Sequence, residues 1–152
     1  MAALTSLLDT IKDHAIITNQ KGIILYANAA AEKHTGFSRE EMIGRKPQEL
    51  WGGLMPEEFY DKMWKQILSG KSFTGEIRNR KKTGAIRWQE LYIFPFYLAR
   101  YPMIFMAIEP DMEIQETRNL GQIFYASFPL EFQEPPSVCQ FVAWIESVLS
   151  SL

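Results

Sequence analysis

Three strand-like runs in the second half of the chain most constrain its fold, because short turns separate them. The runs span residues 73–79, 86–96 and 103–109 and are rich in β-branched and aromatic side chains. The first two are joined by residues 80–84, a turn of hairpin length that ends in glycine. Such short connections favour antiparallel neighbours, since parallel strands need a long crossover. The pattern therefore predicts an antiparallel sheet.

Two further strands are predicted near the N-terminus. Residues 15–18 and 23–27 are β-rich and flank the turn Asn19-Gln20-Lys21-Gly22, which is typical of a hairpin. A run of small residues at 29–33 then favours a helical turn that ends at Gly36. With the three later strands, this order predicts an α+β fold with a five-stranded antiparallel sheet and helices on one face.

Two more helices have recognisable ends. Ser38 and Glu41 have the spacing of a capping box, and Gly44 follows as a stop. The longest predicted helix spans residues 56–69, with Pro56 at its first position and Gly70 just after its end. Its apolar residues form two neighbouring rows at i, i+4 spacing, so one side of the helix is expected to face the core.

The two ends of the chain are predicted to lie outside the sheet domain. Residues 1–14 form an amphipathic N-terminal helix, centred on 3–13, in which Leu4, Leu8 and Ile11 share one side. Residues 15–111 form the core domain. Residues 112–152 form a C-terminal extension that is rich in aromatic residues and closes with a helical tail.

Composition excludes several classes of function. The 152 residues carry 16 basic and 18 acidic side chains, a net charge of −2, so no basic field for nucleic acid is expected. No apolar run reaches membrane-spanning length and no secretory signal is visible, which predicts a cytoplasmic protein without a membrane partner. The single cysteine, Cys139, excludes an intrachain disulfide. The imidazoles of His14 and His34 are expected to be solvent-exposed or structural rather than metal ligands.

Alternation along the strands predicts a polar group at the edge of the core. Phe73, Ile77 and Asn79 share one face of their strand, and Gln89, Leu91 and Ile93 share one face of the next. A buried asparagine needs partners, and its amide offers both a donor and an acceptor to a heterocycle. The alternative is that Asn79 bonds only to backbone or water.

The opposite face of the strand at 86–96 is also apolar, so it needs a cover. We expect a homodimer in which part of this face meets a second copy, although cover by the chain's own terminal helices is the alternative. The residues predicted at the dimer interface are Trp88, Tyr92, Phe94, Leu4 and Leu8.

Motifs along both halves of the chain resemble a PAS domain over about residues 5–111. They are Ile16-Ile17-Thr18, Gly22-Ile23-Ile24-Leu25-Tyr26-Ala27-Asn28, the stretch from Thr35-Gly36-Phe37 to Gly44-Arg45, Gly75-Glu76-Ile77-Arg78-Asn79 and Trp88 with Pro95. The resemblance implies a five-stranded sheet, a helical side that encloses a small pocket, and a sensory or interaction role.

Within that family the chain resembles two flavin-binding branches, the light-oxygen-voltage (LOV) domains and the redox sensors of nitrogen-fixation regulators. The resemblance implies FAD or FMN as cofactor and places Asn79, Gln89 and Glu109 at the flavin ring, the last with a carboxylate in place of an amide. It also implies a contact from Trp64, for which a plain core role is the alternative. Pro47 follows Gly44-Arg45-Lys46 near the position of the reactive LOV cysteine, so a thiol adduct is excluded.

These observations predict a non-enzymatic sensory module, since no nucleophile–base pair or phosphate loop is visible. It would bind a small planar ligand, with flavin favoured, and would pass redox or ligand state to an effector that acts in trans or has been lost. The alternative is a cofactor-free PAS module for association, with its pocket filled by Trp64, Phe59 and Met63. Pro110 follows the last strand directly, so we expect the tail to fold back on the domain.

Overall fold

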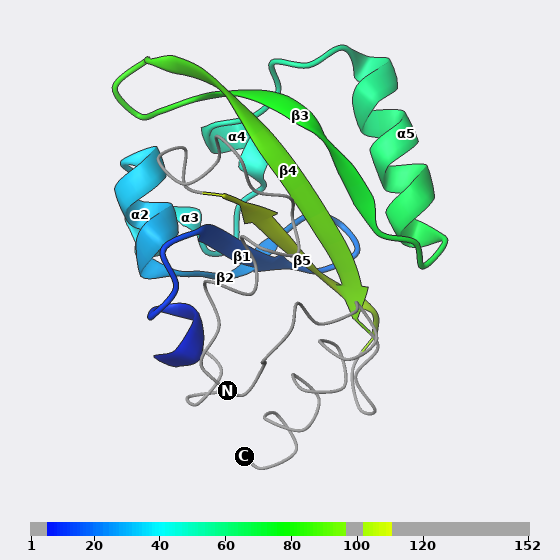
Figure 1. Cartoon of the computed structure of the whole chain (residues 1–152), viewed down its shortest axis with the longest axis horizontal. Coiled ribbons are helices and arrows are strands. Elements are labelled where there is room, and N and C mark those ends of the chain that lie inside the picture. The colour runs from blue at the N-terminus through cyan, green and yellow to red at the C-terminus, as the bar shows by residue number, and fades with distance from the viewer. Residues whose placement is uncertain (1–5, 97–101, 111–152) are drawn as a thin grey trace.

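The computed structural model describes residues 6–96 and 102–110, which form one five-stranded antiparallel sheet with helices (Figure 1). The strands run in the order β2-β1-β5-β4-β3. The last strand therefore lies between two hairpins that are separate in the sequence. The strands are β1 (His14–Thr18), β2 (Ile24–Ala27), β3 (Phe73–Arg80), β4 (Ile86–Phe96) and β5 (Ile104–Glu109). The predicted α+β fold is confirmed.

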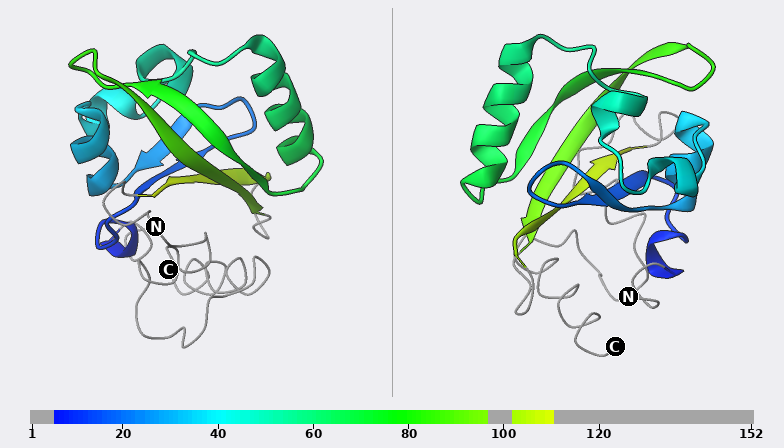
Figure 2. Two further views of the ribbon diagram at one scale, coloured as in Figure 1. Left: turned by 45° about the horizontal axis from the view of Figure 1, so that its top comes forward. Right: turned by 180° about the vertical axis from the view of Figure 1, so that it is seen from behind.

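Four helices lie between the two hairpins in sequence and pack on one face of the sheet, which we call the inner face (Figure 2). They are α2 (Ala29–Thr35), α3 (Arg39–Met42), α4 (Pro47–Leu50) and α5 (Glu57–Leu68). Met63 and Ile67 of α5 pack against β3, β4 and β5, while Ala31 and Met42 pack against β1 and β2. Among the described segments, no helix is long and apolar enough to cross a bilayer.

Most of the predicted helix ends are confirmed. Ser38 Oγ accepts a hydrogen bond from Glu41 N–H and Glu41 Oε1 accepts one from Ser38 N–H, both at 3.2 Å. Gly36 ends α2 with a φ of 83°, a left-handed conformation that glycine adopts without strain.

Two local predictions were wrong, and one helix was missed. Pro56 is the N-cap of α5, with extended backbone, rather than its first helical residue. Helix α4 was not predicted, since its four residues are too few to show a periodic pattern. At the N-terminus the described helical residues end at Leu8, where a turn replaces the rest of the predicted helix.

The opposite, outer face of the sheet is covered in part by the chain's own N-terminal segment. Leu8 is fully buried in a cluster with Phe94, Phe96 and Met106. Tyr92 packs at the edge of this cluster, and Trp88 remains 55% exposed. Of the residues predicted at a dimer interface, Leu8 and Phe94 are thus buried within the chain, and Leu4 lies outside the described residues. The predicted C-terminal helix also lies outside them.

One buried side chain, Asn28, joins the N-terminal segment to the sheet and to α2. Its Oδ1 accepts hydrogen bonds from Ala15 N–H at 3.0 Å and from Ala31 N–H at 2.9 Å. Its Nδ2 donates to the carbonyl oxygens of Leu8 and Asp13, both at 2.9 Å. All four hydrogen-bonding positions of the amide are therefore used, with no exposure to solvent.

We expect Asn28→Ala to lower the free energy of unfolding by about 3 kcal/mol or more, because it leaves several buried backbone groups without a partner. Asn19→Ala is the matched control: Asn19 Oδ1 also accepts two backbone N–H bonds, from Lys21 and Ile23, but in a turn open to water. It should cost about 1 kcal/mol. Urea unfolding followed by circular dichroism measures both, and equal losses would contradict the anchoring role of Asn28.

Candidate ligand-binding site

A cavity of about 320 Å³ lies between the inner face of the sheet and the helices α4 and α5. This volume is at the lower end of the range of small-molecule sites, roughly 300 to 1,000 Å³. Most of its wall is apolar, and polar groups lie at its mouth and at its inner end. The apolar walls are formed by Ile16, Met63, Trp64, Ile67, Ile77, Leu91, Ile93, Phe105 and Ala107.

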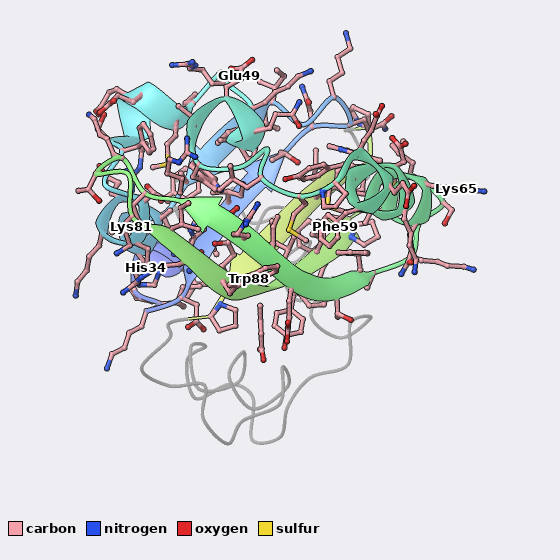
Figure 3. The ribbon with its side chains drawn as sticks, turned by 90° about the horizontal axis from the view of Figure 1, so that it is seen from above. His34, Glu49, Phe59, Lys65, Lys81 and Trp88 are labelled. Atoms are coloured by element: carbon pink, nitrogen blue, oxygen red, sulfur yellow. The ribbon has the colours of Figure 1, made fainter. Side chains whose placement is uncertain are left out.

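Helix α5 supplies the wall opposite the sheet. The ring of Trp64 meets that of Phe105 edge-on at 5.9 Å, and it lies so close to Gly22 that a Cβ there would come within 3.0 Å of it. The absence of a side chain at Gly22 thus lets the β1–β2 turn close over Trp64. Phe59 points toward the sheet while Lys65 of the same helix points away (Figure 3). The ring of Phe59 packs edge-on against Phe73 at 5.6 Å, outside the cavity lining.

Loops form the polar mouth of the cavity. Gln20 and Lys21 contribute from the β1–β2 turn, Lys46 from the residue before α4, and Gly52 and Gly53 from the loop after it. The hydroxyl oxygen of Tyr60 accepts hydrogen bonds from the backbone N–H groups of Gly53 and Met55, at 3.0 and 3.2 Å. This loop is therefore tied to α5 and has a defined place at the mouth.

Three buried polar side chains from three strands meet at the inner end of the cavity. Antiparallel pairing sets His14 of β1 directly opposite Glu109 of β5, and His14 Nδ1 lies 3.7 Å from Glu109 Oε2. Asn79 of β3 donates from Nδ2 to Glu109 Oε1 at 2.9 Å. All three side chains are at least 94% buried and line the cavity.

Two buried atoms at this end have no hydrogen-bond partner in the described structure: Asn79 Oδ1 and His14 Nδ1. Leaving a buried acceptor unpaired costs about 1 to 3 kcal/mol, so most such groups in folded proteins are satisfied. An unpartnered acceptor in the wall of a cavity is suited to a ligand that donates a hydrogen bond. The residues present therefore fit a planar heterocycle with an N–H on its edge, as a flavin ring has.

Burial controls the charge of this cluster. It raises the pKa of the Glu109 carboxyl to about 7, against the smaller opposing effect of the hydrogen bond from Asn79. Burial also lowers the pKa of His14 to about 3, and the nearby His34 lowers it further. His14 is therefore neutral at pH 7, and its contact with Glu109 is not an ion pair although the distance would permit one.

The structure places most of the predicted site residues around one cavity. Asn79, Glu109, Trp64, Leu91 and Ile93 all line it. Gln89 does not. Its Oε1 lies 3.4 Å from Asn79 Nδ2, and the side chain lines a much smaller neighbouring cavity.

His14 is the site residue that the sequence interpretation missed. The sequence left open whether this histidine is solvent-exposed or structural; in the structure only 1% of the residue is exposed, and it lines the cavity. Its ring packs edge-on against Trp51 at 5.3 Å, and Arg80 N–H holds Trp51 in place by donating to its carbonyl oxygen at 2.7 Å. The available signal was alternation in β1, where His14 shares a face with Ile16 and Thr18.

We expect Glu109 to make the protein less stable as the pH rises. Its pKa is about 7 in the folded chain and near the ordinary 4.5 when unfolded. The unfolded chain therefore loses this proton first, and the free energy of unfolding falls between pH 4.5 and 7. Glu109→Gln cannot ionise, so its stability relative to the parent protein should rise over this interval by about 3 kcal/mol.

Chemical denaturation at a series of pH values measures this difference. Glu76→Gln is the control, because Glu76 is exposed on β3 and should show no such dependence. Parallel stability curves for the parent protein and Glu109→Gln would contradict the assigned burial effect.

Comparisons with known proteins agree with this architecture. The family model described as "PAS fold" matches residues 2–110. A nitrogen fixation regulatory protein of Klebsiella oxytoca is 24% identical over 102 residues, which are 66% of this chain and 21% of that protein. Phototropin-1A of Oryza sativa subsp. japonica is 37% identical over 73 residues, 47% of this chain and 8% of that protein.

A solved PAS domain from Colwellia psychrerythraea superposes with a TM-score of 0.58 at 26% identity and covers 70% of this chain and 92% of that one. The chain thus spans about a fifth or less of the two curated relatives described above, but nearly all of a separately solved domain. The family match extends over most of the chain. The chain belongs to the PAS family.

Proposed function

We propose that this chain is the sensory part of a signalling protein and that it binds a planar heterocycle, with FAD or FMN favoured, in the cavity beneath α5. The observation that carries the proposal is the unpartnered Asn79 Oδ1 in the wall of a largely apolar cavity of about 320 Å³. The sensory role is the one common to the PAS family, and one relative is a regulatory protein by name.

Different residues of the cavity would contact different parts of such a ring. Trp64 on α5 and Leu91 and Ile93 on β4 supply apolar walls, and Asn79 Oδ1 supplies an acceptor at the closed end. The mouth, with Lys21 and Lys46, is open to a polar or phosphorylated tail. A bound flavin would supply a redox-active ring whose hydrogen-bonding edge changes on reduction.

The signal would pass through the sheet. Asn79, Gln89 and Glu109 come from the three adjacent strands β3, β4 and β5 and already contact one another through Asn79 Nδ2. A change in what Asn79 binds therefore alters hydrogen bonds on all three strands. If these strands shifted relative to one another, the side chains on the outer face and the segments packed on them would also shift.

The cofactor-free alternative is less well supported. It requires Trp64, Met63 and Phe59 to fill the pocket, yet Trp64 and Met63 line an open volume and Phe59 packs against Phe73 instead. Because the PAS region is a small part of its curated relatives, we propose that the output comes from an effector protein or from another domain, and that this chain is not itself an enzyme.

We expect the purified protein to bind riboflavin, FMN or FAD and to show the visible absorption of bound flavin. Asn79→Leu should weaken binding about tenfold, because losing one hydrogen bond to a buried acceptor costs about 1.4 kcal/mol. Glu76→Leu is the matched control, since Glu76 lies on the same strand, is exposed and does not line the cavity. Fluorescence titration measures the affinities. A parent protein that binds none of the three flavins would overturn the cofactor assignment.

We also propose that the protein forms a homodimer through the outer face of the sheet near Trp88. Trp88 and Ile86 are 55% and 52% exposed, and the Arg78 guanidinium lies 6.0 Å from the centre of the Trp88 ring. Large apolar side chains that are exposed side by side on one strand often mark an interface.

The double variant Ile86→Ser/Trp88→Ser should shift the protein from dimer to monomer in size-exclusion chromatography with light scattering, because each large apolar side chain contributes about 1.5 to 3 kcal/mol when buried. Leu25→Ser is the control, since Leu25 is 43% exposed on β2 at the other edge of the sheet. A parent protein that stays monomeric at high concentration would contradict the dimer.

A further inference from the structure

The polar end of the cavity offers different hydrogen bonds according to whether Glu109 carries a proton. The two N–H groups of Asn79 Nδ2 donate to Glu109 Oε1 at 2.9 Å and to Gln89 Oε1 at 3.4 Å, so Asn79 presents only its acceptor, Oδ1, to a ligand. An ionised Glu109 would add only further acceptors. A neutral Glu109 adds one O–H donor beside the acceptor of Asn79. Only the neutral form therefore matches a heterocycle edge with an N–H next to a carbonyl oxygen or a ring nitrogen.

We propose that the pocket binds such a heterocycle together with a proton on Glu109, which serves as a neutral O–H donor while Asn79 Oδ1 accepts the ligand N–H. The inference rests on the proposed function, because it names how the same cavity recognises its ligand. When Glu109 is ionised before binding, the complex takes up one proton from water for each ligand bound. Affinity then depends on pH even for a ligand that does not itself titrate.

The described residues around Glu109 supply no cation that would stabilise its ionised form. Among the described residues, no lysine or arginine lies within ion-pair distance of it, and His14, at 3.7 Å, is kept neutral by burial. Solvent reaches the lysines at the mouth. Several other titratable or charged groups lie around the cavity and its polar end. They are Asp13 just before β1, His14 on β1, His34 on α2, Tyr60 on α5, Lys21 and Lys46 at the mouth, and Arg80, Lys81 and Arg87 around the neighbouring small cavity.

Burial then sets the pH range of the effect. The carboxyl of Glu109 has a pKa of about 7 in the chain without ligand. Below this pH the donor is already present and binding takes up little proton. Above it, affinity should fall about tenfold for each pH unit, since one proton is added per ligand bound.

Riboflavin is the appropriate probe, because it has no phosphate that titrates in this range. We expect the full chain to bind riboflavin about 30-fold more weakly at pH 8.5 than at pH 6, as measured by fluorescence titration. Glu109→Gln keeps an N–H donor of similar shape but cannot ionise, so its affinity should be the same at both pH values. Glu76→Gln, on the exposed side of β3, should behave like the parent protein.

Calorimetry gives an independent readout. Riboflavin binding at pH 8.5 in two buffers of different ionisation enthalpy should show uptake of about one proton by the parent protein and none by Glu109→Gln. If circular dichroism shows that the variant does not fold, the number of protons that the parent protein takes up per riboflavin bound still tests the proposal.

The two proposals fail in different ways. Riboflavin binding that is equally strong at pH 6 and pH 8.5, or a proton uptake near zero at pH 8.5, would overturn the proton linkage and leave the flavin site standing. The linkage would also be overturned if Glu109→Gln kept the pH dependence of the parent protein. A parent protein that binds no riboflavin even at pH 6 would overturn the flavin site and the linkage together.

Discussion

The pairing of β1 with β5 is the constraint on which the rest of the structure depends. The two hairpins, β1–β2 and β3–β4, can each form from local sequence, but alone they leave the free edges of β1 and β4 unpaired. Strand β5 pairs with β1 on one side and with β4 on the other, and so joins the hairpins into one sheet. Its register sets Glu109 opposite His14 and within reach of Asn79. The cavity and its polar end exist only because this strand lies in the middle.

The polar end of the cavity reduces stability in a way that is typical of functional sites. A carboxyl and an imidazole are buried at a distance too long for a hydrogen bond, and desolvation raises the pKa of Glu109 to about 7 and lowers that of His14 to about 3. An apolar pair would pack there without this cost. Shifted pKa values in a cavity are associated with function, and here Asn79 bonds to Glu109 through Nδ2, which leaves its Oδ1 without a partner among the described residues.

The two faces of the sheet would connect the proposed ligand site with the proposed surface for a partner. On β4, side chains alternate between the helix-covered side, where Leu91 and Ile93 line the cavity, and the outer side, where Trp88 is exposed. A ligand that displaces this strand would therefore also displace the side chains on the outer surface, without any intervening element. Part of that surface is already covered by Leu8, so the N-terminal segment would move with the sheet.

Alternation and helix-end signals in the sequence were enough to predict the five strands and most helix ends. They also predicted that Asn79, Leu91 and Ile93 face the inner side of the sheet. These features depend only on neighbours within a few residues. Alternation assigns a residue to a face but does not say which strand lies beside it. Only the tertiary structure therefore set His14 against Glu109, turned Gln89 toward a neighbouring small cavity and buried Phe94 under the N-terminal segment. Those contacts follow from the long-range pairing of β5, whose strand neighbours no local pattern encodes.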